Sequence, residues 1–139
     1  MTIEPAERRT SIARLVRVRP DLVEIHYDPG CTLTLPHMGE VQEARRELMG
    51  TRPYGMITII PEDVDYQLPA MDKDHLAEDR TQGQLVATAV VARANMIEML
   101  VKLYFSYFPQ MHRIHVTADE VEARAWLETQ LEQDTRTGS

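Results

Sequence analysis

The residues best suited to chemistry crowd into one acidic segment, "MDKDHLAEDR", at residues 71–80. If this segment is a helix, His75 and Asp79 lie on one face, one turn apart, and so do Asp74 and Glu78. An imidazole and a carboxylate so placed could hold a divalent metal together with a ligand from elsewhere in the chain. A solvated acidic helix explains the same pattern. The sequence favours that second interpretation, because no HExxH or EF-hand spacing accompanies these residues.

The other histidines and the only cysteine are spread over separate predicted elements. His112 and His115 flank a predicted strand at a spacing that turns their side chains to opposite faces, so they cannot chelate one metal. His26, Cys31 and His37 fall on a strand end, a turn and a helix start. A cysteine next to a helix start can have a lowered thiol pKa. No base is positioned beside Cys31, however, and the sequence favours an ordinary turn residue.

Nucleotide-binding and serine-hydrolase motifs are absent from the sequence, which has no GxGxxG, GxxxxGK[ST] or GxSxG string. Serine itself is scarce and occurs only as Ser11, Ser106 and Ser139. A serine nucleophile with a histidine and an acid is therefore not expected. We predict no catalytic residue, no metal and no cofactor, and a protein that is not an enzyme.

Composition and charge narrow the classes of partner. The 139 residues carry a formal net charge of −7, which argues against nucleic-acid binding. A single cysteine cannot form an intramolecular disulfide, and the N-terminus lacks the apolar centre of a secretory signal. The apolar run from Leu85 to Phe108 contains Arg93, Glu98 and Lys102, so no membrane span is predicted. We expect a cytoplasmic protein.

The elements that must position these residues alternate between strands and helices. Hydrophobic periodicity and turn residues predict strands at 13–19, 22–27, 54–60, 85–92 and 113–116, and helices at 34–50, around 71–80, 95–108 and 117–133. Such an order predicts an α/β fold with a mixed, mainly parallel five-stranded sheet, an antiparallel N-terminal edge strand and about four helices. One domain covers 12–132, between a flexible N-terminal lead at 1–11 and a polar C-terminal tail at 133–139.

Helix ends and burial can be predicted at particular residues. Thr34 and Gly50 are the expected caps of the first helix, and Thr117 with Glu120 forms the expected capping box of the last. The predicted core includes Val16, Val18, Ile57, Ile59, Val86, Val90, Trp126 and Leu127. Side chains predicted to face water include Arg17, Arg19, Arg45 and Arg46.

The helix predicted over 95–108 has more apolar surface than one sheet can cover, because its polar residues fill only a narrow arc of the helical wheel. The side assigned to the core comprises Ile97, Val101, Tyr104 and Phe108. The surface assigned to an interface or an apolar ligand comprises Met96, Met99, Leu100, Leu103 and Tyr107. Methionine adapts to irregular surfaces, and tyrosine suits interfaces. We therefore expect a homodimer formed through this surface.

Three strings stand out in the second half of the chain: "LVATAVVARANMIEMLVKLYFSYF", "RIHV" and "TADEVEARAWL". Together with the order of elements, they resemble an uncharacterised branch of the STAS-like group of small bacterial proteins related to anti-sigma-factor antagonists. The resemblance covers about residues 12 to 132. It implies a STAS-like α/β fold, and related folds bind lipids.

One departure from the antagonist proteins concerns their phosphorylation site, an Asp-Ser-Ser/Thr-Gly turn. In the matching stretch, "ITIIPEDVDYQLPAMDKDHL", Asp72 is followed by Lys73, and no serine or threonine lies between Thr58 and Thr81. A phosphate added here would also meet like charges. We therefore predict that the chain is not a switch of the phosphorylated type.

The sequence as a whole predicts a non-catalytic regulatory or protein-interaction module without the phosphorylatable serine. A second function stays open, that of a binder or carrier of a small apolar or amphipathic ligand. An enzyme with His75 in its site is a less favoured third. The expected partners are a second copy of the chain and either an unidentified protein or an apolar ligand.

Overall fold

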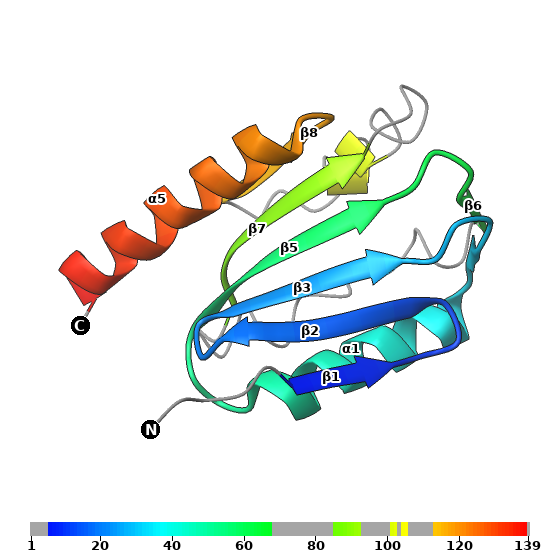
Figure 1. Cartoon of the computed structure of the whole chain (residues 1–139), viewed down its shortest axis with the longest axis horizontal. Helices are drawn as coiled ribbons and strands as arrows, with labels where there is room; N and C mark the ends of the chain where they lie inside the picture. The colour runs from blue at the N-terminus through cyan, green and yellow to red at the C-terminus, as the bar shows by residue number, and fades with distance from the viewer. Residues whose placement is uncertain (1–5, 68–84, 93–100, 103, 106–112, 139) are drawn as a thin grey trace.

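The chain folds around one mixed sheet of six strands in the order β1-β2-β3-β5-β7-β8 (Figure 1). The computed structural model describes residues 6–67, 85–92, 101–102, 104–105 and 113–138, with side chains as far as residue 133. The strands are β1 Ala6–Arg9, β2 Ala13–Arg19, β3 Leu22–Tyr27, β4 Thr32–Leu33, β5 Tyr54–Ile60, β6 Asp65–Tyr66, β7 Leu85–Ala92 and β8 Ile114–Thr117. The labelled helices are α1 Leu35–Met49 and α5 Glu120–Gly138.

The first three strands are antiparallel, and the remaining strands of the sheet run parallel to β3. β2 and β3 form the predicted hairpin around the turn at Pro20 and Asp21. β4 and β6 form a separate parallel pair. Parallel pairing requires crossover connections between the strands. β5 lies between β3 and β7, near the centre of the sheet.

The number of elements differs from the prediction of five strands and about four helices. The sheet has six strands, because Ala6–Arg9, expected within a flexible lead, pairs with β2. The described residues contain two labelled helices, α1 and α5. The other two predicted helices fall on 71–80, which lies outside the described residues, and on 95–108. Of that last range only 101–102 and 104–105 are described, and these are helical.

Helix α1 begins and ends where its capping residues predict. The backbone N–H of His37 donates to Oγ1 of Thr34 at 3.2 Å, which satisfies one of the free amides of the first turn. At the other end, Gly50 has a φ of 66° and donates its N–H to the carbonyl of Arg46 at 3.0 Å. A positive φ costs glycine little, so this position ends the helix cleanly.

Helix α5 begins later than the predicted capping box. Its first turn is capped by Asp119, whose Oδ1 accepts the backbone N–H groups of Val121 at 2.9 Å and of Glu122 at 3.3 Å. Thr117, the predicted cap, instead ends β8, and its Oγ1 accepts the N–H of Asp119 at 3.1 Å. The capping-box pairing of Thr117 with Glu120 was therefore wrong by two positions.

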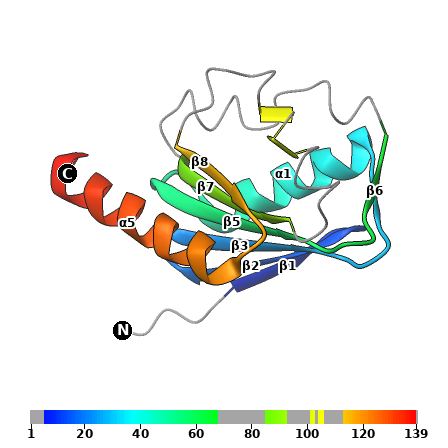
Figure 2. The same ribbon diagram turned by 90° about the horizontal axis from the view of Figure 1, so that it is seen from above.

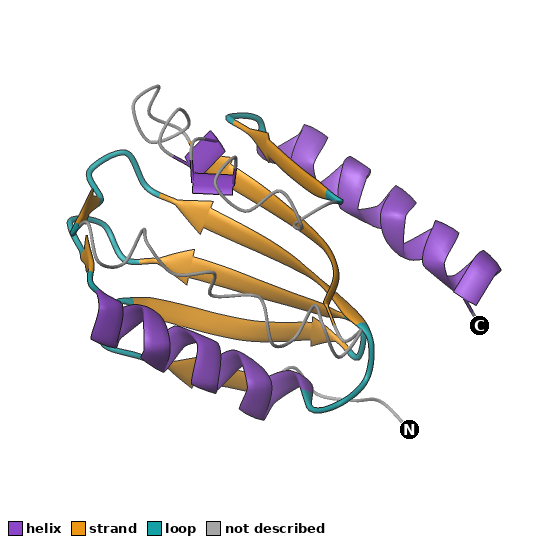
Figure 3. Ribbon diagram, turned by 180° about the vertical axis from the view of Figure 1, so that it is seen from behind, coloured by secondary structure: helices purple, strands orange, loops and turns teal. Residues whose placement is uncertain are grey.

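The two helices cover opposite faces of the sheet (Figures 2 and 3). The α1 face of the sheet packs against the buried stripe of α1, and the α5 face packs against Ala123, Leu127 and Leu131. α1 contacts β1 and β2, whereas α5 contacts β5, β7 and β8. The two helices are thus offset from each other across the sheet. Neither α1 nor α5 covers the whole of the sheet face on which it packs.

The alternation in β2 was read with the wrong face inside. Leu15 is fully buried on the α1 face, whereas Val18 is 39% exposed and Val16 is only half-buried. Arg17 lies on the α1 face and donates from Nη1 to the carbonyl of Leu48 at 3.0 Å. Its guanidinium satisfies a carbonyl at the end of α1, where positive charge is favourable. The predicted burial of Ile57, Val90 and Leu127 is confirmed, and Ile59, Val86 and Trp126 pack against the α5-side core.

Candidate ligand-binding cavity

An apolar cavity of about 110 Å³, partly open to solvent, lies on the α1 face of the sheet. It falls where the offset of α1 leaves the central strands β3, β5 and β7 to be covered by the helical residues Val101, Tyr104 and Phe105. Its lining consists of Ile25, Tyr27, Leu33, Met38, Gln42, Met56, Thr58, Ile60, Thr88, Val90, Val101, Tyr104 and Phe105.

The cavity arises because strands contribute alternate residues to each face. On β5 and β7 the residues that face α1 include Thr58, Thr88 and Val90, which are shorter than the leucines and aromatics of an ordinary core. Above them, Met38 of α1 and Phe105 of the second helical segment come from separate elements. Short side chains below and two covering elements above leave unfilled volume between them.

One lining residue, Gln42, contacts a buried arginine. Arg45 is fully buried and Tyr54 is 1% exposed, and Nη1 of Arg45 donates to the phenol oxygen of Tyr54 at 2.6 Å. Nε of Arg45 also donates to Oε1 of Gln42 at 3.2 Å, and Nη2 donates to the same oxygen. The prediction that Arg45 faces water was therefore wrong. Gln42 lines the cavity and also accepts from the guanidinium of Arg45, so it connects the cavity with the buried cation.

Two threonines, Thr58 and Thr88, line the floor of the cavity. Thr88 is 2% exposed and Thr58 is 9% exposed. Both lie on the same face of adjacent strands, since Thr88 pairs with Met56 and Thr58 pairs with Val90. Hydroxyl groups are both donors and acceptors, so they can meet a polar group of a bound molecule.

The phenol of Tyr27 adds a third hydroxyl to the lining. Burial raises its pKa, so the phenol is neutral and keeps its proton across the physiological range. The hydroxyl donates to the sulfur of Met38 at 3.7 Å, which is a weak acceptor. None of the described residues that line the cavity is an acid, a base or a thiol. Its chemistry is therefore that of binding through shape, apolar contact and neutral hydrogen bonds.

The residues predicted from the sequence as an interface or ligand surface lie outside the described residues. This group is Met96, Met99, Leu100, Leu103 and Tyr107. The acidic segment with His75 lies outside them too. The homodimer therefore stays a prediction. On the opposite side of the same predicted helix, Val101 and Tyr104 pack against the α1-side core, as assigned, and they also line the cavity.

The described histidines and Cys31 do not form one shared site, and Nδ1 of His37 is buried without a hydrogen-bond partner among the described residues. His26 lies 3.0 Å from Glu24, and His115 lies 2.7 Å from Glu122 while stacking on Trp126. Among the described residues no group of three or more histidines, cysteines or acids is placed to hold a metal. Burial and the nearby acids raise the pKa of the Cys31 thiol, which is the opposite of an activated cysteine.

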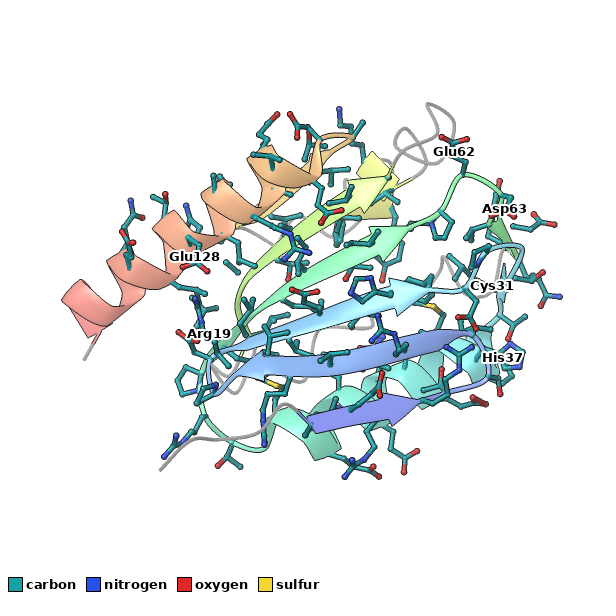
Figure 4. The ribbon with its side chains drawn as sticks, viewed as in Figure 1. Arg19, Cys31, His37, Glu62, Asp63 and Glu128 are labelled. Atoms are coloured by element: carbon teal, nitrogen blue, oxygen red, sulfur yellow. The ribbon has the colours of Figure 1, made fainter. Side chains whose placement is uncertain are left out.

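Polar side chains on the other face of the sheet fasten α5 to the hairpin. Nη1 of Arg19, at the end of β2, meets Oε1 of Glu128 at 2.9 Å (Figure 4). Further along α5, Nη1 of Arg124 donates to Oε2 of Glu24 at 2.7 Å. Burial opposes the ionisation of Glu24, but its hydrogen bonds, above all from Arg124, outweigh burial and lower its pKa. These pairs are structural contacts, remote from the cavity on the α1 face.

Gln42, Thr58 and Thr88 were not predicted from the sequence as site residues. One signal was available: "YGMITII" and "LVATAVVA" each carry one threonine in an otherwise apolar run, and a hydroxyl in a buried strand needs an explanation. For Gln42 the signal was its place beside Val41 on the buried stripe of the helix.

In the described parts of the chain no helix is long and apolar enough to cross a membrane.

Comparison with known proteins gives a structural neighbour only. No protein-family model and no curated protein matches the chain. A crystal structure at 2.25 Å, of an uncharacterized DUF3478-family protein from Shewanella loihica PV-4, is similar with a TM-score of 0.50 and 16% sequence identity. The similarity covers 89% of this chain and 92% of that one, which is described as having a SpoIIAA-like fold. The chain therefore has a SpoIIAA-like, that is STAS-like, mixed α/β fold.

Proposed function

We propose that this chain is a non-catalytic binding module that takes a small apolar or amphipathic molecule into the cavity on the α1 face. The observation that carries the proposal is the cavity itself, about 110 Å³ of unfilled space walled mainly by apolar side chains. Protein interiors are normally close-packed, with few voids larger than a water molecule. Unfilled apolar space costs stability, and a ligand that fills it recovers that loss.

The lining supports a non-catalytic role. The described residues there offer hydroxyl, phenol and amide groups, which orient a ligand without exchanging a proton with it near neutral pH. General acid–base or nucleophilic chemistry needs a positioned imidazole, carboxylate, amine or thiol. Binding is thus the chemistry for which these side chains are suited.

The position of the cavity supports a regulatory use of the binding. The cavity lies between α1, represented by Met38 and Gln42, and the helical segment of Val101, Tyr104 and Phe105. A molecule between these elements changes the contacts of both at once, and binding shifts an equilibrium between two arrangements by its differential affinity for them. In this proposal ligand occupancy takes the role that phosphorylation has in the antagonist proteins.

Labelled methionine methyl groups test the proposal inside the cavity. Met38 and Met56 line it, whereas Met49 is buried at 5% exposure in the same core without lining it. On titration with isopentanol, a branched alcohol of suitable size, we expect saturable shifts of the Met38 and Met56 methyl signals. The Met49 signal should move little, because the probe does not contact it.

A filled cavity provides the control for specificity. Val101→Phe adds bulk at a residue that lines the cavity, so it should weaken isopentanol binding and leave the fold intact. Val121→Phe makes the same exchange at a position on α5 that is 78% exposed, and should leave binding unchanged. The proposal is wrong if isopentanol shifts neither cavity methionine, or if the two variants bind the probe equally well.

A further inference from the structure

The amide of Gln42 has only one orientation that suits its buried neighbour. An arginine guanidinium can only donate hydrogen bonds, so the oxygen of the Gln42 amide must face Arg45, as the contact from Nε at 3.2 Å shows. The other terminal atom of the amide is its nitrogen, Nε2. It has no hydrogen-bond partner among the described residues, although Gln42 is only 8% exposed and lines the cavity.

The N–H₂ group of Gln42 is a donor in the lining of the cavity without a partner among the described residues. A bound molecule that supplies an acceptor can pair with it. Gln42 is also polarised, because its oxygen accepts from the cation of Arg45 and hydrogen bonds in a chain strengthen one another.

We propose that the cavity selects a small monocarboxylate whose carboxylate oxygen accepts from Nε2 of Gln42, with its branched apolar body against Ile25, Met56 and Val90. The inference deepens the ligand-binding function proposed above and depends on it. The structure places Arg45 directly behind Gln42, so the cation of Arg45 favours an anion at the amide.

The rest of the lining agrees with an acceptor rather than an amine. The described lining residues include no carboxylate that could balance the charge of an ammonium group. Thr58 and Thr88 line the same cavity, and a threonine hydroxyl can donate to a second carboxylate oxygen. A carboxylate is an acceptor with two oxygens, and it matches donors from both α1 and the sheet.

The volume limits the ligand to a short chain. An apolar cavity of about 150 Å³ holds benzene in another protein, and the cavity here is somewhat smaller, at about 110 Å³. By the same comparison a branched hydrocarbon body of about four carbons fills that space, and the cavity is partly open, so the polar end of the ligand need not lie inside the same volume. Isovalerate has such a body and one carboxylate, which makes it a suitable probe for the proposed class.

The experiment compares probes that share one carbon skeleton and differ in the polar end. Isovalerate, isovaleramide, isopentanol and isopentylamine are titrated near neutral pH, with the methyl signals of Met38 and Met56 as the readout. We expect isovalerate to bind about tenfold or more tightly than isopentanol, since hydrogen bonds to charged groups are the stronger ones. Isopentylamine should bind most weakly.

A variant of Gln42 tests the role of its amide. Gln42→Glu keeps the oxygen that accepts from Arg45 and replaces the donor with a second acceptor, so the fold should persist while isovalerate binding falls about tenfold or more. Isopentanol binding should change little. Gln130→Glu is the matched control, because Gln130 also accepts from an arginine, Nε of Arg113 at 3.0 Å, but lies on α5 away from the cavity.

The outcomes separate this inference from the proposed function. If no probe shifts the two methionine signals, the ligand-binding function itself is wrong. If isopentanol binds but isovalerate binds no more tightly, the function stands and the carboxylate inference is overturned. If isovalerate is preferred, yet Gln42→Glu and Gln130→Glu weaken it equally, the preference reflects overall charge and the assignment to Gln42 is overturned.

Discussion

Replacing Gly55 with alanine tests the packing of α5 on the sheet most directly. A Cβ at this position would lie 3.0 Å from Cδ1 of Leu127, and 3.0 Å and 3.3 Å from Cδ2 and Cδ1 of Leu131. Optimal carbon–carbon separations are about 3.5–4.0 Å. Leu127 and Leu131 are nearly fully buried, so their methyl groups, or α5 with them, must give by a few tenths of an ångström to relieve these contacts.

The expected cost follows from two opposing effects. Overfilling a well-packed core costs about 1–3 kcal/mol, whereas exchanging glycine for alanine stabilises by about 0.4–1 kcal/mol through the unfolded chain. Gly55→Ala should therefore lower the free energy of unfolding by roughly 1–2 kcal/mol. Urea unfolding followed by fluorescence measures it, because Trp126, the only tryptophan, lies on α5 with its ring 5.3 Å from His115.

A second substitution distinguishes packing from other causes. In a Leu131→Ala background two of the three close contacts are removed and the one to Leu127 remains, so adding Gly55→Ala should cost less than it does alone, and the two changes should couple by at least about 0.5 kcal/mol. Gly39→Ala is the control, since nothing lies within 4 Å of a Cβ there and alanine favours a helix. Packing of α5 on Gly55 is contradicted if Gly55→Ala raises the free energy of unfolding, as Gly39→Ala should. It is also contradicted if Gly55→Ala lowers that free energy equally in the wild-type and Leu131→Ala backgrounds.

Three further predictions concern other parts of the molecule. Because Glu24 has a lowered pKa, its contribution to stability is present above the ordinary glutamate value of about 4.3 and is lost as pH falls through the lower folded value. Urea unfolding at several acidic pH values should therefore show a weaker pH dependence for Arg124→Met than for wild type, and equal slopes would contradict this. Tyr54→Phe removes the acceptor of Nη1 of Arg45 and should cost about 1–3 kcal/mol in the same unfolding assay, and an unchanged stability would show the bond to be dispensable. From the sequence, light scattering after size exclusion should find a dimer that Leu103→Asp converts to a folded monomer; a monomeric wild type would end the dimer hypothesis.

The sequence predicted the architecture well because periodicity and capping are local properties. Charge-free runs flanked by turn residues marked β5 and β7 correctly, and Thr34 with Gly50 located α1. Alternation, however, shows only that two faces differ, and not which one is inside. In β2 the alternation predicted that Val16 and Val18 face the core, but it is Leu15 that is buried there.

The candidate site was harder to predict, because its members depend on tertiary contacts. Arg45 looked like a solvated helix residue, and its burial depends on Tyr54, which follows the helix in another element. The cavity exists because α1 is offset toward β1 and β2, and an offset between layers leaves no periodic signature in the sequence. Only the aromatic helix predicted over 95–108 pointed toward the right region, through Val101 and Tyr104.

The central place of β5 also bears on aggregation. Its sequence, "YGMITII", has no charge and no proline, which is the composition of segments that form cross-β assemblies. In the folded chain β3 and β7 occupy both of its edges, so its backbone is released only when the whole sheet opens. Pro53 and Pro61 stand on either side of the strand and limit how far a stray pairing can spread. Variants that loosen the sheet should therefore form insoluble material through β5 before they show any other loss.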